Sequence, residues 1–129
     1  MLTKKYNITD AELEITKLLW QNKALTLNKI VENLSKEEKK NKSTIKTLLY
    51  RLIEKGSVKS IEHNSKENEY IATITKEEYL KKENDTFLKK LYNGSTNKLL
   101  LNFVEEKKIS KQDLKDLLLL IESEDQDIW

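Results

Sequence analysis

The sequence KSTIKTLLYRLIEKG, residues 42–56, has the pattern of one amphipathic helix. Five apolar residues follow the i, i+3, i+4, i+7, i+8 spacing, which places them on a single helical face. These residues are Ile45, Leu48, Leu49, Leu52 and Ile53. Gly56 comes directly after the last apolar turn and suits the left-handed conformation that commonly ends a helix. The pattern therefore predicts a helix with one buried face that ends near Gly56.

The opposite face of this helix has the chemistry of a DNA-reading surface. It carries cations, hydroxyl groups and a phenol, and a helix of this kind fits the major groove of DNA. An ordinary solvated amphipathic helix shows the same pattern, so the neighbouring sequence has to support the interpretation. The residues predicted to contact DNA from this helix are Lys42 at its start and Ser43, Lys46, Thr47, Tyr50 and Arg51 on its outer face.

Positive charge is concentrated around this helix. The whole chain of 129 residues has a formal net charge of only +2. Between Lys23 and His63, however, 10 Lys or Arg stand against 5 Asp or Glu, whereas residues 74–129 have 10 against 12. A local excess of cations in a nearly neutral chain is typical of a nucleic-acid-binding surface.

Capping signals predict helices on both sides. Two capping boxes, residues 9–12 and 75–78, open helices that end near residues 22 and 92, and Thr26 is a plausible cap for another. The first helix has a second apolar face, Leu13 and Trp20, so contacts on two sides are expected, one of them with the C-terminal part; a plain core helix with a large aromatic explains Trp20 equally well. With residues 42–56, the predicted helices are about 10–22, from 27 into the charged run 35–42, 76–92, 99–104 and from 111 onward.

Two segments after Gly56 have the partial alternation of β-strands. They are VKSIEH, residues 58–63, and NEYIAT, residues 68–73, with a polar turn at 64–67 between them. Three helices followed by a hairpin is the order of a winged helix-turn-helix. His63, the single histidine, lies in this wing, where we expect a surface or phosphate-contacting residue.

The last three helices contain more leucine than a covering layer for the first ~75 residues requires. Exposed apolar patches of this size normally meet a partner, and self-association is the simplest choice. We therefore expect a mostly α protein with a small β-hairpin wing: a winged helix-turn-helix domain at 1–75 and a helical dimerisation domain at 76–129. The predicted dimerisation residues are Leu99, Leu100, Leu101, Phe103, Leu117, Leu118 and Ile121.

The composition argues against several other classes of protein. There is no cysteine, which excludes a disulfide framework and a thiolate metal site. No Gly-rich phosphate loop, His/Cys cluster or nucleophile elbow is present. We predict no catalytic residue, no metal and no cofactor. The N-terminus lacks an apolar signal core and no run approaches the ~20 apolar residues of a membrane span, so we expect a cytoplasmic protein without membrane insertion.

Nearly the whole chain resembles the penicillinase and methicillin-resistance repressors, the BlaI/MecI family. The likeness lies in ITDAELEITKLLW at 8–20, STIKTLLYRLIEKG at 43–56, Tyr70 at the end of the wing and LYNGSTNKLLLNFVEE at 91–106. The resemblance implies a dimeric winged-helix repressor that binds a palindromic operator in double-stranded DNA and controls β-lactam resistance or related genes. Its DNA-reading part corresponds here to Ser43, Thr44, Lys46, Thr47 and Arg51.

The resemblance also implies how repression ends. In that family a membrane-spanning antibiotic sensor relieves repression, and the process ends in cleavage of the repressor at an Asn-Phe bond. The matching residues here are Asn102 and Phe103. Copper-responsive relatives end in a cysteine-rich tail, and a chain without cysteine departs from them.

Two alternative functions fit the residues. The chain could be a winged-helix regulator released by a small ligand held between its domains, or a helical protein-interaction module without DNA binding. Salt-sensitive, palindrome-specific binding would separate both regulators from the interaction module. DNA binding that survives removal of every small molecule would favour the regulator inactivated by proteolysis.

Overall fold

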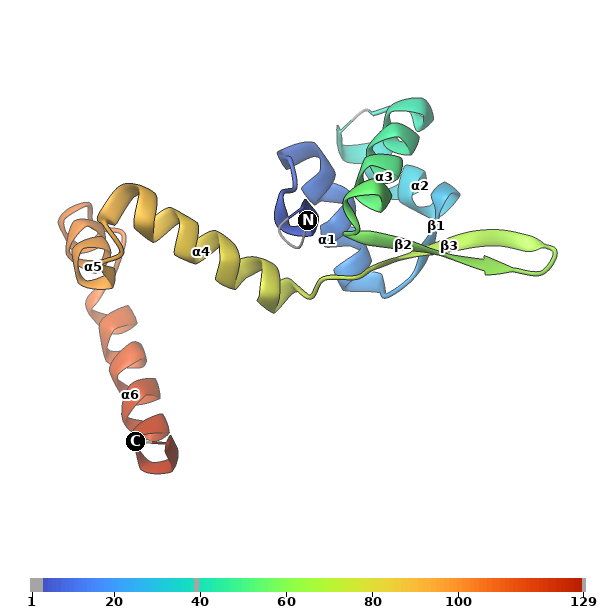
Figure 1. Ribbon diagram of the computed structural model, residues 1–129. Coiled ribbons are helices and arrows are strands. Elements are labelled where there is room, and N and C mark those ends of the chain that lie inside the picture. The colour runs from blue at the N-terminus through green and yellow to red at the C-terminus, as the bar shows by residue number, and fades with distance from the viewer. Residues whose placement is uncertain (1–3, 39, 129) are drawn as a thin grey trace. The chain divides into compact units, whose positions relative to one another are not determined.

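The computed structural model describes residues 4–38 and 40–128, which form six α-helices and a small antiparallel sheet (Figure 1). This arrangement confirms the predicted mostly α fold with a β-hairpin wing. The elements are a short 3₁₀ turn, Lys4–Tyr6, then α1 (Asp10–Asn22), β1 (Leu25–Thr26), α2 (Leu27–Glu38), α3 (Lys42–Lys55), β2 (Val58–His63), β3 (Lys66–Ala72), α4 (Lys76–Tyr92), α5 (Thr96–Glu105) and α6 (Lys111–Ile128).

The chain separates into two compact units, and the boundary between them along the sequence lies within α4. The first extends to Lys82 and the second begins at Glu83. The boundary expected from the sequence lies after residue 75, at the start of α4, whereas the two units divide inside that helix. The first turns of α4 belong to the first unit because Tyr79 packs on Trp20 of α1, with ring centroids 5.7 Å apart. Trp20, from the second apolar face of α1, therefore contacts a residue of α4 within the first unit.

Local hydrogen bonds begin the helices at the predicted residues. The Thr9 hydroxyl accepts a hydrogen bond from the Glu12 amide at 3.2 Å, and the Thr9 amide donates to the Glu12 carboxylate at 3.0 Å. Thr75 and Glu78 repeat the arrangement at the start of α4, with both distances 3.0 Å. Thr26 accepts from the Lys29 amide at 3.2 Å before α2. Both capping boxes and the Thr26 cap are therefore confirmed.

A single hydrophobic core holds the first unit together. The predicted stripe of α3 is buried in it apart from Ile53, which is half-buried at its edge. Each fully buried Leu or Ile contributes roughly 1.5–3 kcal/mol relative to an exposed one, so this stripe fixes which face of α3 points outward. The core residues are Ile15, Leu19, Ile30, Leu34, Ile45, Leu48, Leu49, Leu52 and Val58.

The sheet has the strand order β1-β3-β2, with both pairs antiparallel. The hairpin turn is shorter than predicted: only Asn64 and Ser65 separate the strands, and Lys66, expected in the turn, pairs with His63. Ser65 has a φ of 61°, so one residue of this turn is in the left-handed region. The two-residue strand β1 was not predicted. It forms because Leu25 lies opposite Tyr70 of β3, a contact distant in the sequence.

The second unit consists of helices with little interior. Asn93 and Gly94 have φ values of 51° and 79°, and this confirms the predicted break after α4. Among its described side chains, residues 83–124, none is fully buried. Phe87 and Leu91 of α4 are exposed in the single chain, at 41% and 59% of their surface. Leu80, in the first unit, is likewise 46% exposed.

Membrane-spanning character is absent from the helices within residues 4–38 and 40–128. Within the described part of the chain, none is both long enough and apolar enough to cross a bilayer.

Candidate functional site

The outer face of α3 is the centre of the candidate site. All the residues predicted to contact DNA have exposed side chains, and all except His63 lie on α3. Behind them the apolar stripe packs into the core, so the helix cannot rotate without exposing it. The exposed residues are Lys42, Ser43, Thr44, Lys46, Thr47, Tyr50, Arg51 and His63.

Both ends of α3 are fixed by local structure. The Asn41 side chain accepts a hydrogen bond from the Thr44 amide at 2.8 Å, which satisfies one of the unpaired amides of the first turn. Gly56 has a φ of 83°, the left-handed conformation predicted from the sequence. Asn41 was not predicted as the cap. The signal that could have found it is an Asn, a preferred N-cap residue, about one turn before Ile45, the first apolar residue of the stripe.

Several outward side chains of α3 already contact other groups of the same helix. The Thr47 hydroxyl donates to the Ser43 carbonyl oxygen at 3.1 Å, so it is oriented with its lone pairs available as acceptors. The Lys46 ammonium lies 5.9 Å from the centroid of the Tyr50 ring, within the range of a cation–π contact. Tyr50 is 51% exposed and Lys46 is exposed too, so this pair remains open to a ligand.

Tyr70 connects this face to the wing. It lies on β3, half-buried. Burial raises the pKa of the Tyr70 phenol, the nearby Tyr50 raises it further, and a hydrogen bond with Ser60 only partly opposes them. Tyr70 therefore stays a neutral phenol at ordinary pH. The sequence marked this residue only through the family resemblance.

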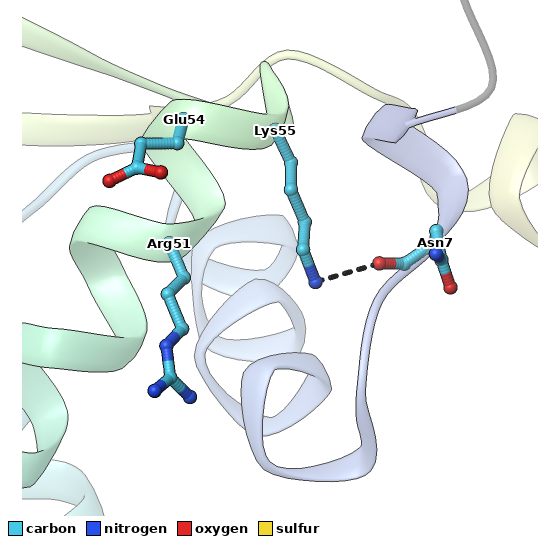
Figure 2. Close-up of a pocket in the computed structure, with 4 residues that line it drawn as sticks. All are labelled: Asn7, Arg51, Glu54 and Lys55. Carbon is cyan, nitrogen blue, oxygen red and sulfur yellow. Dashed lines mark hydrogen bonds between the residues drawn. The ribbon is translucent and has the colours of Figure 1, made fainter. Parts of the chain in front are cut away.

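The C-terminal end of α3 borders an open pocket of about 290 Å³ lined by four residues, Asn7, Arg51, Glu54 and Lys55. Figure 2 shows Lys55 reaching from α3 to the backbone carbonyl of Asn7, a hydrogen bond of 2.8 Å. Lys55 also contacts the carboxylate of Glu12, at 2.5 Å. Lys55 is thus used inside the first unit, whereas Arg51, drawn beside it, is an exposed cation.

The wing is less basic than α3. His63 Nε2 lies 2.7 Å from a carboxylate oxygen of Glu69, and both side chains are 38% exposed. The exposed position of His63 agrees with the prediction, but Glu69 would compete with a phosphate for it. Lys66, opposite His63 in the hairpin, is an exposed cation that the sequence analysis missed. A lysine between two polar turn residues was the available signal.

The second unit holds the residues predicted to form a dimer. Leu99 and Phe103 are half-buried, and the other five are exposed. Those five are Leu100 at 38%, Leu101 at 55%, Leu117 at 44%, Leu118 at 56% and Ile121 at 53%.

The predicted cleavage site lies inside the helix α5. Asn102 and Phe103 are both half-buried. The Tyr92 hydroxyl donates to the Asn102 side-chain oxygen at 2.9 Å, and the Lys108 ammonium lies 5.4 Å from the Phe103 ring centroid. Both side chains of the predicted bond are therefore held by neighbours within the second unit.

Known proteins resemble this chain over most of its length. The penicillinase repressor family model matches residues 8–123. The chain is 32% identical over 117 residues to the penicillinase repressor of Bacillus licheniformis, covering 89% of each. It is also 32% identical over 117 residues to the methicillin resistance regulatory protein MecI of Staphylococcus aureus (strain N315), covering 91% of this chain and 94% of that protein.

A solved structure resembles the first part of the fold. It is the solution structure of the DNA-binding domain of the repressor BlaI, with a TM-score of 0.51 and 33% sequence identity. The match covers 57% of this chain and 88% of the other. The winged-helix fold of the first unit is therefore also found in a domain that binds DNA.

Proposed function

The chain belongs to the penicillinase repressor family, and we propose that it is a homodimeric transcriptional repressor that binds a palindromic operator in double-stranded DNA. The observation that carries this proposal is the outer face of α3, where cations and short hydrogen-bonding side chains are all exposed over a buried stripe. The regulated genes would be those of β-lactam resistance or related functions, as the relatives' names suggest.

In this proposal α3 enters the major groove. Ser43, Thr44 and Thr47 would face the bases, because short hydroxyl side chains can reach base edges. Lys46 and Arg51 would contact phosphates or guanines, and the wing would follow the adjacent backbone. His63 and Lys66 are the basic residues closest to the hairpin turn, and His63 Nε2 already lies 2.7 Å from the Glu69 carboxylate.

The salt dependence of binding tests the DNA-binding part. A dimer that contacts about 6–10 phosphates should lose roughly 10³–10⁵ in affinity between 50 and 200 mM salt. Lys46→Ala and Arg51→Ala should each cost about 1–3 kcal/mol on the operator if the side chain reads a base. A residue that contacts only phosphate would weaken binding to all sequences alike.

The matched control is Lys89→Ala with Lys90→Ala, which removes two exposed cations from α4. This control should leave operator affinity close to wild type. If the double variant Lys46→Ala/Arg51→Ala binds as the wild type does, with an unchanged circular dichroism spectrum, α3 does not read DNA and the proposal is wrong.

Dimerisation would involve the second unit. A helical unit without a fully buried side chain among residues 83–124 has too little interior to be stable alone. A second copy placed against the leucines of α5 and α6 would supply the missing core. Two reading helices joined in this way would match the two halves of a palindrome.

We further propose that cleavage between Asn102 and Phe103 ends repression, through a membrane sensor-protease system. Proteases bind extended chain, so α5 must open locally before the bond can be cut. The hydrogen bond from Tyr92 to Asn102 and the helical position of the bond both oppose that opening. Repression would then persist until the sensor system acts on the second unit.

A further inference from the structure

A cavity of about 310 Å³ lies on the first unit, away from the proposed DNA-binding face. Helix α1 and the first turns of α4 form it, and no residue of α3 or the wing lines it. Its size is at the lower end of the range of small-molecule pockets. The lining residues are Leu13, Lys17, Trp20 and Gln21 of α1 with Lys76, Tyr79 and Leu80 of α4.

The aromatic part of the cavity is rigid before any ligand arrives. The rings of Trp20 and Tyr79 have centroids 5.7 Å apart and an interplanar angle of 49°. The indole Nε1–H of Trp20 donates to the Ile74 carbonyl oxygen at 2.9 Å, which fixes the orientation of the ring. A preformed aromatic wall favours a flat apolar group, because little side-chain entropy is lost when it binds.

One wall of the cavity remains apolar yet open to water. Leu80 is 46% exposed, although it directly follows the buried Tyr79. A ring placed against Leu80 and the Trp20–Tyr79 pair would remove this surface from water, which is favourable in proportion to the area covered.

The polar lining residues carry positive charge without a compensating carboxylate. Lys17 and Lys76 both line the cavity, and no acidic residue is among the lining residues that the structure describes. Lys17 has a partner in Glu14, but the distance is 3.6 Å and both side chains are well exposed, so the pair is weak. Glu77 lines a second hollow, which shares Trp20 and Lys76 with this cavity, and is not among the described lining residues of this one.

We propose that this cavity binds a planar aromatic molecule that carries one carboxylate. The ring lies against Trp20, Tyr79 and Leu80, and the carboxylate lies between the ammonium groups of Lys17 and Lys76. The site shares no described lining residue with the DNA-reading face, α5 or α6. It can therefore exist whether or not the proposed repressor function is correct.

Isothermal titration calorimetry of the full-length protein tests the proposal with 2-naphthoate as the probe. The comparison compound is 2-naphthamide, which has the same rings but no charge. Two partly exposed ion pairs should make 2-naphthoate bind about tenfold more tightly than 2-naphthamide. Amide chemical shifts should move around Trp20 and Tyr79, not around α3.

A pair of lysine variants separates a specific contact from general attraction of anions. Lys17→Gln/Lys76→Gln should lower the affinity for 2-naphthoate to that for 2-naphthamide. The control Lys111→Gln/Lys115→Gln removes the same charge from exposed positions of α6 and should bind 2-naphthoate as the wild type does.

Three results would overturn the proposal. The first is equal affinity of the wild type for 2-naphthoate and 2-naphthamide, or no binding of either. The second is an unchanged 2-naphthoate affinity in Lys17→Gln/Lys76→Gln. The third is a pair of observations: the wild type does not bind 2-naphthoate, and Lys17→Gln/Lys76→Gln sediments as a monomer where the wild type sediments as a dimer. This result would make the surface an interface between copies of the chain.

Discussion

At the scale of single residues, Glu12 joins three segments of the winged-helix unit. Its carboxylate caps α1 through Thr9 and also contacts the ammonium of Lys55, the last residue of α3. Lys55 in turn donates to the carbonyl of Asn7 in the N-terminal segment. Glu12 is only 1% exposed, so its charge depends on these partners rather than on water. One carboxylate thus connects the C-terminal end of α3 to the first turn of α1.

These contacts give the stability of the unit a defined pH dependence. Burial alone would raise the pKa of Glu12, but the hydrogen bonds from Lys55 and Thr9 outweigh it and hold the pKa below its ordinary value of 4.5. A lowered folded-state pKa means that the charged form stabilises the fold. This contribution is complete above about pH 4.5 and is lost as the pH falls through the lower folded-state pKa.

The variant Glu12→Gln should therefore be less stable than the wild type near neutral pH, by about 1–3 kcal/mol, because Lys55 keeps only part of its hydrogen bonding. Denaturant unfolding at pH 7 and at pH 3 measures the difference, which should shrink at pH 3. Glu14→Gln on the same helix is the control and should change stability little, since its pair with Lys17 is exposed. A difference that stays constant between the two pH values would contradict this account.

At the scale of elements, α3 depends on its two ends as much as on its buried stripe. The Asn41 side chain holds the first turn, where Lys42, Ser43 and Thr44 lie, and Gly56 ends the helix before β2. Fraying of the first turn would disorder three of the residues proposed to meet DNA. The cap therefore affects both stability and function.

The variant Asn41→Ala should lower the stability of the first unit by about 1 kcal/mol, because the Thr44 amide loses its acceptor. Thermal unfolding followed by circular dichroism measures this as a drop of roughly 4–8 °C. Asn41→Asp keeps an acceptor oxygen at the same position and serves as the control. Equal melting temperatures of Asn41→Ala and Asn41→Asp would show that the cap does not stabilise α3.

At the scale of the whole molecule, the second unit poses the main physical problem. Its helices expose apolar faces that water would disfavour, and no described side chain from 83 to 124 is fully buried. The exposed apolar surface of α6 alone, from Leu114 to Ile121, is unusually large for a helix that remains in solvent. Self-association is the proposed solution, and two tests address it.

Leu118→Asp should convert the dimer into a folded monomer. The new carboxylate would lie in an apolar contact, where an unpaired charge is strongly disfavoured. Sedimentation velocity at micromolar concentration measures the change. Ser123→Asp adds the same charge on the opposite side of α6 and should leave the dimer intact. A wild-type protein that is already monomeric at this concentration would refute the dimer.

Truncation after Asn102 tests how cleavage would end repression. The shortened chain lacks Phe103, Val104 and the whole of α6, so most of the proposed interface is gone. In a dimer, once one DNA-binding unit is bound, the other meets its half-site at an effective concentration of ~1 mM. With a half-site dissociation constant of roughly 10⁻⁵ M, the loss of that tether should weaken operator binding about 10²-fold. Equal affinity and equal dimerisation of the two proteins on the same palindrome would rule out this mechanism.

The sequence by itself determined the parts of the protein that depend on local interactions. The α3 stripe, both capping boxes and the left-handed residue at Gly56 followed from spacing and residue type, because helical hydrogen bonds join residues only three or four positions apart. The same locality identified the outer-face residues Ser43, Lys46, Thr47, Tyr50 and Arg51, whereas Thr44 was identified through the family resemblance. Asn41 was equally local and was missed.

Only the tertiary structure decided the features that join distant segments. Strand β1 forms because Leu25 meets Tyr70, and Glu12 contacts Lys55 across 43 residues of sequence. The cavity of α1 and α4 likewise requires Trp20 to pack on Tyr79. Neither residue of such a pair carries a local signal of its partner, since the partner is chosen by how the whole core packs. Spacing along the chain therefore showed which way α3 faces, and packing determined what holds it there.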